Sequence, residues 1–287
     1  MKTLIIDTKD TTLKIKENTL HINGRRIPFN LIENILIFSN LTLTTKDINK
    51  IANQNISIIL VDYKLNATLI TPSKPKNSQF KLLQYKAYYK NRLNIAKFIL
   101  TQKINSHLEH LKSLNILLNT DILNKIDNAN SLEELLGIEG SFSKLYFDNF
   151  FANAPKLWHN NKRTKRPPQD PLNALLSFGY TLFYNHLTIK LITAGFEPYI
   201  GFLHSPFRDH NALSSDILEA FRADINDFFL NIIKSKELTL QDFTKNKGVY
   251  LRYEGRKKLY KKWQQFLEDK NTKLSQLLFQ LKEKINE

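Results

Sequence analysis

The stretch ATLITPSKPKNSQFKLL, residues 67–83, divides the chain into two parts with different patterns. Before it, short runs of β-branched residues recur, and after it apolar residues return at helical spacings. Pro72 and Pro75 stand between the two patterns with no large apolar side chain beside them, as in a linker. We therefore predict an α+β protein with a small β-rich N-terminal domain at residues 1–71, a linker at 72–79 and a larger all-α C-terminal domain at 80–287.

The N-terminal part carries several candidate strands and one candidate helix, Thr44–Asn53. Asn23-Gly24 stands between two of the strands. Both residues tolerate a positive φ, so we expect a hairpin with a type I′ turn. The candidate strands are Thr3–Ile6, Thr12–Ile15, Thr19–Ile22, Ile27–Phe29, Ile35–Phe38, Ile56–Val61 and Ala67–Ile70.

The C-terminal part carries apolar residues at helical spacings in successive segments. One helix has clear boundaries, because Asp170 is a natural N-cap and Pro171 suits the first helical position. This helix is predicted to run to Gly195. The other candidate helices are Phe80–Leu118, Ser131–Phe151, Leu213–Ile233 and Glu254–Ile285.

The composition points to a polyanionic partner. The chain has 42 Lys and Arg against 27 Asp and Glu, a formal net charge of +15. This favours nucleic acid or an anionic membrane over a basic surface that serves only solubility. The absence of cysteine excludes disulfides, thiolate catalysis and cysteine zinc sites. Since no signal-peptide core and no apolar run of the ~18 residues that span a membrane is found, we expect a soluble, cytoplasmic protein without a membrane partner.

Two basic clusters are candidates for DNA contact. Lys156–Arg166 (KLWHNNKRTKR) and Arg252–Lys262 (RYEGRKKLYKK) combine phosphate-neutralising side chains with aromatic rings that can stack on bases. The alternative is a solvated loop for the first cluster and a solvated helix face for the second. The candidate contacts are Lys162, Arg163, Lys165, Arg166, Arg256, Lys257 and Lys258.

Three acids and one histidine stand in apolar surroundings, where burial is costly unless they are paired or bind a cation. They are Glu139 between Gly137 and Gly140, His204 in PYIGFLHSPF, and Asp216 and Glu219 in LSSDILEAFR. Each one alone is more often a cap or a hydrogen-bonded core residue. Helix phase places Asp216, half-buried, at the edge of an apolar stripe and Glu219 further round, which favours Asp216 as a ligand.

His107 and His110 stand three residues apart on a predicted helix, with Glu109 between them. This spacing matches no zinc-protease signature. We therefore interpret the two histidines as part of a solvated helix face.

Four runs occur in an order and spacing that resemble one known family. They are GIEGSFSKLYFDNF (137–150), RPPQDPLNALLSFGYTLFY (166–184), GFEPYIGFLHSP (195–206) and DILEAFR (216–222), followed by VYLRYEGRKKLYKKW (249–263). Together they resemble the CRISPR-associated integrase-endonuclease of the spacer-acquisition (adaptation) module. Departures are SPFRDHNALSS between His204 and Asp216, ADIND after Arg222, and Lys144 where an Arg is common.

The resemblance implies a β-rich domain that forms a homodimer and a helical domain whose metal is bound by Glu139, His204 and Asp216, with Glu219 as a possible supporting acid. Carboxylates and an imidazole suit Mg²⁺ or Mn²⁺. The implied reaction is antiviral DNA integration: a 3′-hydroxyl of a short duplex attacks a phosphodiester at a CRISPR repeat, and water at the same centre gives endonuclease activity. The implied partners are double-stranded DNA and a small CRISPR adaptation protein in a hetero-oligomer.

Other functions stay open on the residues themselves. The chain could be a stand-alone structure-selective DNA nuclease of repair, which cleaves without joining. It could be a non-catalytic, basic nucleic-acid-binding scaffold, although ligand residue types at all three positions argue against this. A membrane-surface protein is more distant and rests on the basic, amphipathic last helix.

Overall fold

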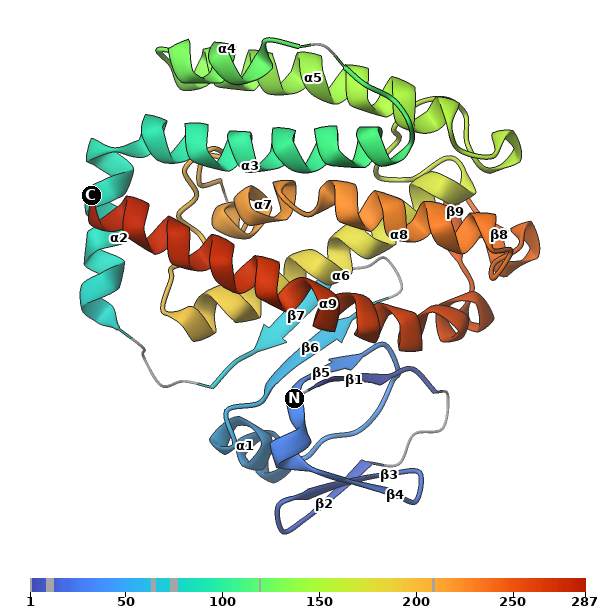
Figure 1. Cartoon of the computed structure of the whole chain (residues 1–287). Helices are drawn as coiled ribbons and strands as arrows, with labels where there is room; N and C mark the ends of the chain where they lie inside the picture. Colours follow the sequence, from blue (N-terminus) through green and yellow to red (C-terminus); the bar gives the residue numbers. More distant parts are fainter. Residues whose placement is uncertain (1, 9–12, 63–65, 73–76, 119, 208–209) are drawn as a thin grey trace. The chain divides into compact units, whose positions relative to one another are not determined.

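The computed structural model describes residues 2–8, 13–62, 66–72, 77–118, 120–207 and 210–287 (Figure 1). Contacts group the chain into two units. The first is Met1–Pro75 with Arg256–Asn271, and the second is Lys76–Gly255 with Thr272–Glu287. The long C-terminal helix therefore contributes to both units, although the predicted domain boundaries assign all of it to the second. Residue 12 of an expected strand and residues 73–76 of the expected linker lie outside the described residues.

The first unit is built from strands, one short α-helix, a 3-10 turn and part of the long C-terminal helix. A four-stranded sheet has the order β1-β5-β6-β7, in which β1, β5 and β6 run parallel and β7 antiparallel, and a second sheet has the order β2-β3-β4. The elements are β1 (Lys2–Ile6), β2 (Leu13–Lys16), β3 (Thr19–Ile22), β4 (Arg25–Pro28), η1 (Phe29–Leu31), β5 (Ile32–Ile37), α1 (Thr45–Asn53), β6 (Ser57–Val61) and β7 (Ala67–Ile70).

Local signals explain these elements. Asn23 (φ 47°) and Gly24 (φ 81°) connect the antiparallel strands β3 and β4, which confirms the predicted hairpin. Helix α1 begins after Thr44, whose hydroxyl accepts from the amide of Asp47 in a capping box. Aliphatic residues from both sheets, among them Ile35 of β5 and Leu20 of β3, form the core of the unit.

The second unit is largely helical. Its elements are α2 (Ser78–Lys90), α3 (Arg92–Ser113), α4 (Ile122–Asn128), α5 (Leu132–Ala152), η2 (Lys156–Trp158), α6 (Pro171–Ala194), α7 (Ala212–Glu219), α8 (Arg222–Lys234), η3 (Leu240–Asp242), β8 (Phe243–Lys245), β9 (Val249–Leu251) and α9 (Tyr253–Asn286). Strands followed by helices confirm the predicted α+β class, with the short β8–β9 hairpin as an addition to the helical part.

Two of the predicted helices are each two helices. The run Phe80–Leu118 breaks at Asn91, and the run Leu213–Ile233 breaks at Ala220 and Phe221. Periodicity alone does not reveal such breaks, because the apolar stripes continue on both sides of each bend. The second break matters for function, since it makes Glu219 the last residue of α7.

Helix α6 crosses the second unit and is buried along most of its length. Its ends are as predicted. The Asp170 carboxylate accepts from the amide of Asn173 at 2.8 Å, Pro171 is the first helical residue and Gly195 (φ 93°) ends the helix. Helix α3 contacts α5, α7 and α8, and Figure 1 shows α4 and α5 running alongside α3.

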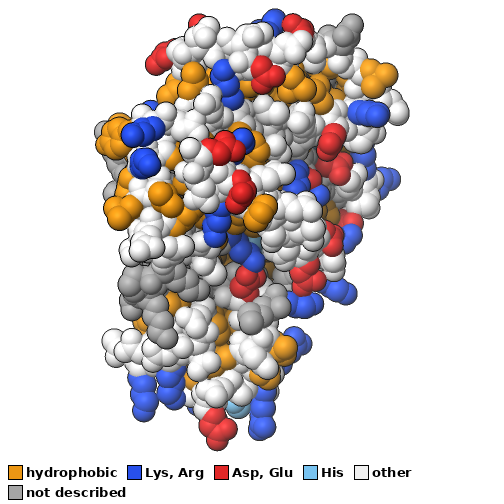
Figure 2. All heavy atoms as spheres, turned by 60° about the vertical axis from the view of Figure 1, so that its left-hand side comes forward, with side chains coloured by type: hydrophobic (Ala, Val, Ile, Leu, Met, Phe, Trp, Pro, Cys, Tyr) orange, Lys and Arg blue, Asp and Glu red, His pale blue; other side chains and the backbone are white. Residues whose placement is uncertain are grey.

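Charged side chains are spread over the visible face of the molecule. In Figure 2, Lys and Arg side chains are interspersed with acidic and hydrophobic ones instead of gathering in a single patch. Among the described residues, no helix combines the length and the apolar character that a membrane crossing requires.

Candidate metal and nucleic-acid site

A pocket of about 600 Å³ in the second unit collects most of the residues singled out in the sequence. It receives side chains from α3, α5, the loop after η2, the loop before α7, and the α7–α8 junction. Six basic and three acidic side chains line it, with two histidines. The lining residues are Lys103, His107, Glu139, Ser143, Lys144, Phe147, Asp148, Phe151, Asn161, Lys162, Arg163, Lys165, His204, Glu219 and Arg222.

Helix α5 presents one face to this pocket. Glu139, Ser143 and Phe147 repeat every four residues, so they lie above one another on the helix surface. Ser143 donates to Glu139 Oε1 at 2.8 Å. The helix begins after Ser131, whose hydroxyl accepts from the amide of Glu134. This cap and the packing of α5 on α3 set the position of Glu139.

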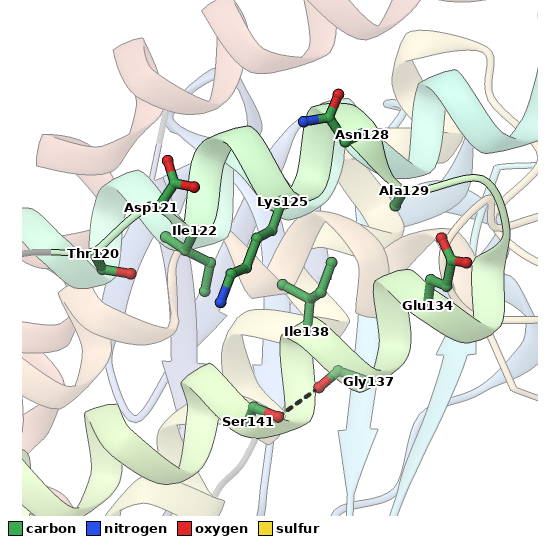
Figure 3. Close-up of a pocket in the computed structure, with 10 residues that line it drawn as sticks. All are labelled: Thr120, Asp121, Ile122, Lys125, Asn128, Ala129, Glu134, Gly137, Ile138 and Ser141. Carbon is green, nitrogen blue, oxygen red and sulfur yellow. Dashed lines mark hydrogen bonds between the residues drawn. The ribbon is translucent and has the colours of Figure 1, made fainter.

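The neighbouring side of α5 lines a second, more open pocket against α4 (Figure 3). Lys125 and Ile138 project into the space between the two helices, and Ser141 donates to the carbonyl of Gly137 at 2.9 Å. Asp121 and Glu134 are the acidic side chains of this lining and Lys125 its basic one. The charge balance thus differs from that of the first pocket, where basic residues are in excess.

Lys103 of α3 links two acids of the first pocket. Its ammonium group forms an ion pair with Glu139 Oε1. It forms a second ion pair with Glu219 Oε2, in which the nitrogen and the oxygen are 2.7 Å apart. The Lys103 side chain is 3% exposed and that of Glu219 is 5% exposed, whereas Glu139 is 27% exposed. Glu139 is therefore the carboxylate that is more open to an incoming ligand.

Glu219 lies between two cations. Arg222 Nε donates to its Oε1 at 2.8 Å, while Lys103 pairs with its Oε2. Burial alone raises the pKa of a carboxyl group, but Arg222 and Lys103 outweigh it and hold the pKa of Glu219 well below its usual range. Glu219 is therefore ionised at neutral pH.

The environment of Asp216 differs from that of Glu219, because the partners of Asp216 are mainly backbone amides. Its Oδ2 accepts from the backbone amides of Phe202 (2.6 Å) and Leu203 (3.1 Å), and its Oδ1 accepts from the amide of His204 (2.8 Å). The same Oδ1 lies 2.8 Å from His204 Nδ1. Asp216 is fully buried and does not line the pocket. Its carboxylate anchors the loop that carries His204.

His204 is held by this contact in a defined orientation. With Nδ1–H donated to Asp216, the other ring nitrogen, Nε2, keeps its lone pair for a ligand. Burial lowers the pKa of His204, but the hydrogen bond to Asp216 and the nearby Glu219 charge raise it above the ordinary value on balance. The side chain is 37% exposed and lines the pocket.

The structure therefore brings together Glu139, His204 and Glu219, and it places Asp216 behind His204. The sequence interpretation assigned Asp216 to the metal and Glu219 to a supporting role. Helix phase placed Asp216 half-buried at the edge of the apolar stripe, whereas both acids are buried. The pocket lies at the end of α7, and Glu219, the last residue of this helix, lines it.

The prediction of a solvated face for His107 and His110 is wrong, because both are buried. His107 Nδ1 lies 2.8 Å from the carbonyl oxygen of Lys103, and its ring packs on Tyr146. Burial, with the nearby Lys103 charge, lowers the pKa of His107 to about 3, so it is neutral at physiological pH. His110 Nδ1 contacts the Tyr146 hydroxyl at 2.7 Å.

The loop between η2 and α6 contains two kinds of basic residue. Lys162 and Lys165 are exposed and line the pocket. Arg163 is turned inward and donates to Asn173 Oδ1 at 2.8 Å and to Ser177 Oγ at 3.2 Å. Arg166 is exposed and is not part of the lining. Arg163 thus fixes the loop, and the two lysines face the space where a ligand would lie.

The candidate contacts of the second basic cluster, Arg256, Lys257 and Lys258, belong to the first unit. Arg256 donates to Asp7 Oδ2 at 2.9 Å and its guanidinium lies 5.5 Å from the ring centre of Phe38. Lys257 and Lys258 are exposed on α9. Arg256 therefore connects α9 to the end of β1, while the two lysines lie on the outer face of the helix.

The types of donor in the pocket suit a divalent metal ion. Two carboxylates and one imidazole are ligands of Mg²⁺ and Mn²⁺. Within the part of the chain that the structure describes, however, no three His, Asp or Glu side chains come together closely enough to enclose an ion. The Lys103 ammonium group stands between the two carboxylates. The carboxylate and imidazole donors suit a divalent ion chemically. Binding of the ion requires the Lys103 ammonium group to move away from the carboxylates.

Comparison with known proteins identifies the family. The model of the family described as CRISPR associated protein Cas1 matches residues 4–265. The chain belongs to the Cas1 family. It is 30% identical to a CRISPR-associated endonuclease Cas1 of Thermodesulfovibrio yellowstonii, over 95% of this chain and 93% of that protein. The resemblance found in the sequence motifs is thereby confirmed.

Solved structures with the Cas1 fold cover nearly the whole chain. A Cas1 protein of Thermotoga maritima superposes with a TM-score of 0.91 at 23% identity, over 99% of this chain and 97% of that one. A casposase bound to its integration product superposes with a TM-score of 0.81 at 24% identity, over 93% and 83% of the two chains. At these identities the two structures establish the fold of this family member.

Sequence reasoning did not single out two residues of this Cas1-family pocket, Lys103 and Arg222. Lys103 had a detectable signal. It follows Ile95 and Ile99 at intervals of four residues, so it lies in the apolar stripe of α3, where a lysine is unexpected. Arg222 follows Glu219 by three residues, a spacing at which opposite charges meet on a helix. Only the fold shows that both residues act on Glu219.

Proposed function

We propose that this chain is a metal-dependent DNA integrase and endonuclease that inserts short duplexes into a CRISPR array. The reaction is a transesterification in which a 3′-hydroxyl of the duplex attacks a phosphodiester at the edge of the repeat. The observation that carries the proposal is the pocket that combines Glu139, His204 and Glu219 with six basic side chains. Membership of the Cas1 family, with relatives named as endonucleases, supports it.

Glu139, His204 and Glu219 are proposed to hold Mg²⁺ or Mn²⁺, in place of the set with Asp216 that the motifs implied. Asp216 instead orients His204 and fixes its tautomer through the 2.8 Å contact with Nδ1. A bound divalent ion neutralises negative charge on the phosphodiester under attack. Arg222 and Ser143 keep the two carboxylates in position through their hydrogen bonds.

The basic residues of the pocket are proposed to bind DNA phosphates. Lys162 and Lys165 are exposed at its wall, on a loop that Arg163 fixes to Asn173 and Ser177. Lysine side chains bind phosphates as point charges, without base specificity. Lys144 of α5 is exposed and lines the same pocket. DNA would therefore be held by its backbone across the carboxylates.

Two protein partners follow from the family resemblance. The β-rich N-terminal domain is proposed to mediate a homodimer, and a small CRISPR adaptation protein is proposed to complete a hetero-oligomer. The exposed Lys257 and Lys258 of the second basic cluster are proposed to contact DNA as well. Arg256, which pairs with Asp7, is assigned a structural role.

The test is an integration assay with purified protein, the small adaptation partner, Mn²⁺, a short duplex and a repeat-bearing plasmid. Glu139→Gln, His204→Ala and Glu219→Gln are each expected to reduce joining by about 10²-fold or more, as losses of charge-stabilising groups do. Thermal unfolding of each variant shows whether the fold survives. A Glu139→Gln variant that joins the duplex as well as the wild type would refute the proposed site.

The same assay separates the alternatives. A stand-alone repair nuclease would cleave branched or linear DNA in Mn²⁺ and would join nothing to the plasmid. A non-catalytic scaffold would bind DNA without cleavage or joining, and it would bind no divalent ion in a calorimetric titration.

A further inference from the structure

A buried lysine stands where the two carboxylates of the proposed metal site meet. Lys103 pairs with Glu139 Oε1 and with Glu219 Oε2, and only 3% of its side chain is exposed. Lys103 comes from α3, whereas Glu139 and Glu219 come from α5 and from the end of α7. The lysine therefore connects three separate elements at the floor of the pocket.

Burial of this ammonium group depends on its partners. A charge removed from water is tolerated when opposite charges and hydrogen bonds compensate it. Its two partners are the same acids that are proposed to bind the ion. An ammonium group and a divalent cation are attracted by the same oxygens, so occupation by one opposes occupation by the other.

The charge of the pocket strengthens this competition. Six basic and three acidic side chains line it, so the lining is already positive without an ion when its histidines are neutral. A divalent ion that enters the protein alone meets repulsion from Lys103, Arg222 and the lysines of the wall. DNA phosphates would reverse this balance, because they bring negative charge to the same space.

We propose that Lys103 is a built-in counter-cation of the metal site. It holds Glu139 and Glu219 in position before an ion binds, it competes with the ion for them, and it makes ion binding depend on DNA. This inference rests on the proposed function, because it takes Glu139 and Glu219 to be metal ligands. Lys103 is thus a positioning residue that sets the order in which the site is filled.

The test measures Mn²⁺ binding by the loss of the free-ion electron paramagnetic resonance signal. The full-length protein is used with and without a short DNA duplex, and the binding by the duplex alone is subtracted. Wild-type protein is expected to bind Mn²⁺ weakly by itself and more tightly with DNA. Lys103→Met is expected to bind Mn²⁺ about tenfold more tightly than the wild type without DNA, since one opposing charge is gone. The gain in Mn²⁺ affinity on adding DNA is expected to be smaller for this variant than for the wild type.

Thermal unfolding gives a second readout. In the absence of metal, Lys103→Met is expected to melt at a lower temperature than the wild type, because Glu139 and Glu219 lose their shared partner. Mn²⁺ is expected to restore the melting temperature of this variant. Lys103→Gln, which keeps a hydrogen-bond donor and loses the charge, provides the same comparison if the methionine variant does not fold.

Matched variants isolate the effect of position. Lys103→Arg keeps the charge and is expected to bind Mn²⁺ as weakly as the wild type. Lys97→Met removes a lysine from the same helix outside the pocket, where Lys97 donates to the carbonyl of Asp127, and it is expected to leave Mn²⁺ binding unchanged. A similar gain in Mn²⁺ affinity for Lys97→Met would mean that overall charge, and not Lys103, sets the affinity, which would overturn the proposal.

Failure of this inference differs from failure of the proposed function. If Glu139→Gln loses Mn²⁺ binding but Lys103→Met and Lys103→Gln bind Mn²⁺ no more tightly than the wild type, Lys103 is only a structural partner. If the wild type binds no Mn²⁺ even with DNA, the metal site itself is wrong and the role of Lys103 falls with it.

Discussion

At the scale of single residues, Asp216 and Glu219 have different tasks although both are buried on α7. Asp216 accepts from three consecutive backbone amides and from His204. Glu219 accepts a hydrogen bond from Arg222 and forms an ion pair with Lys103 at the pocket. A carboxylate that is fully engaged with backbone amides has little capacity left for a metal ion, which is why we assign the metal to Glu219.

Asp216→Asn is expected to lower the free energy of unfolding by about 2–4 kcal/mol, because an amide offers one acceptor oxygen where the carboxylate offers two charged ones. The measurement is urea-induced unfolding followed by circular dichroism. The comparison variant is Asp148→Asn, an exposed acid of the pocket wall, which should unfold near the wild-type midpoint. Equal midpoints for Asp216→Asn and the wild type would contradict the anchoring role.

At the scale of elements, α5 places Glu139 between two exposed glycines, Gly137 and Gly140. Neither glycine is required by the packing, since a Cβ at either position meets no atom within 4 Å. Gly179 of α6 is different, because a Cβ there would overlap the ring of Phe229 and crowd Ile225. The same residue type thus serves close helix packing in α6 and leaves the surface of α5 open.

Replacing a glycine by alanine is expected to change the stability of the protein in opposite directions in α5 and α6. Gly140→Ala is expected to stabilise the protein by about 0.5–1 kcal/mol through helix propensity. Gly179→Ala is expected to destabilise it by about 1–3 kcal/mol through overpacking against α8. The measurement is the melting temperature of each variant compared with that of the wild type. Destabilisation by Gly140→Ala would show that the surface of α5 is less open than described.

At the scale of the whole molecule, the net charge is +15, but the Lys and Arg side chains on the face that Figure 2 shows do not gather in one patch. Two exposed lysines, Lys162 and Lys165, face the pocket that holds the acids. Arg163 and Arg256 of the two basic clusters instead make hydrogen bonds within their own units. Counting charges in the sequence therefore overestimates the number of side chains that are available to DNA.

Lys162→Gln with Lys165→Gln is expected to weaken DNA binding at low salt and to reduce the slope of log K against log salt concentration by about 2, as for two lost phosphate contacts. The measurement is fluorescence anisotropy with a labelled duplex over a salt series. Lys97→Gln with Lys125→Gln removes the same charge outside this pocket and should leave the slope near that of the wild type. An unchanged slope for Lys162→Gln with Lys165→Gln would indicate that this loop is a solvated surface loop that does not contact DNA phosphates.

Features that depend on neighbours along the chain were predictable from the amino-acid sequence. The Asn23-Gly24 hairpin, the capped ends of α6 and the change from strands to helices follow from local propensity and periodicity. The ordered motifs from Gly137 to Arg222 likewise identified the family, because each motif is a short contiguous run.

The partners of each acid are visible only in the folded chain. Lys103, Glu139, His204 and Glu219 come from four segments, and their distances depend on how α3, α5 and α7 pack. Periodicity indicates which face of one helix is buried, but it does not indicate which side chain of another helix lies opposite that face. For the same reason the position of Lys103 between two carboxylates was not predictable from the sequence pattern, whereas His107 continues the four-residue series of Ile95, Ile99 and Lys103.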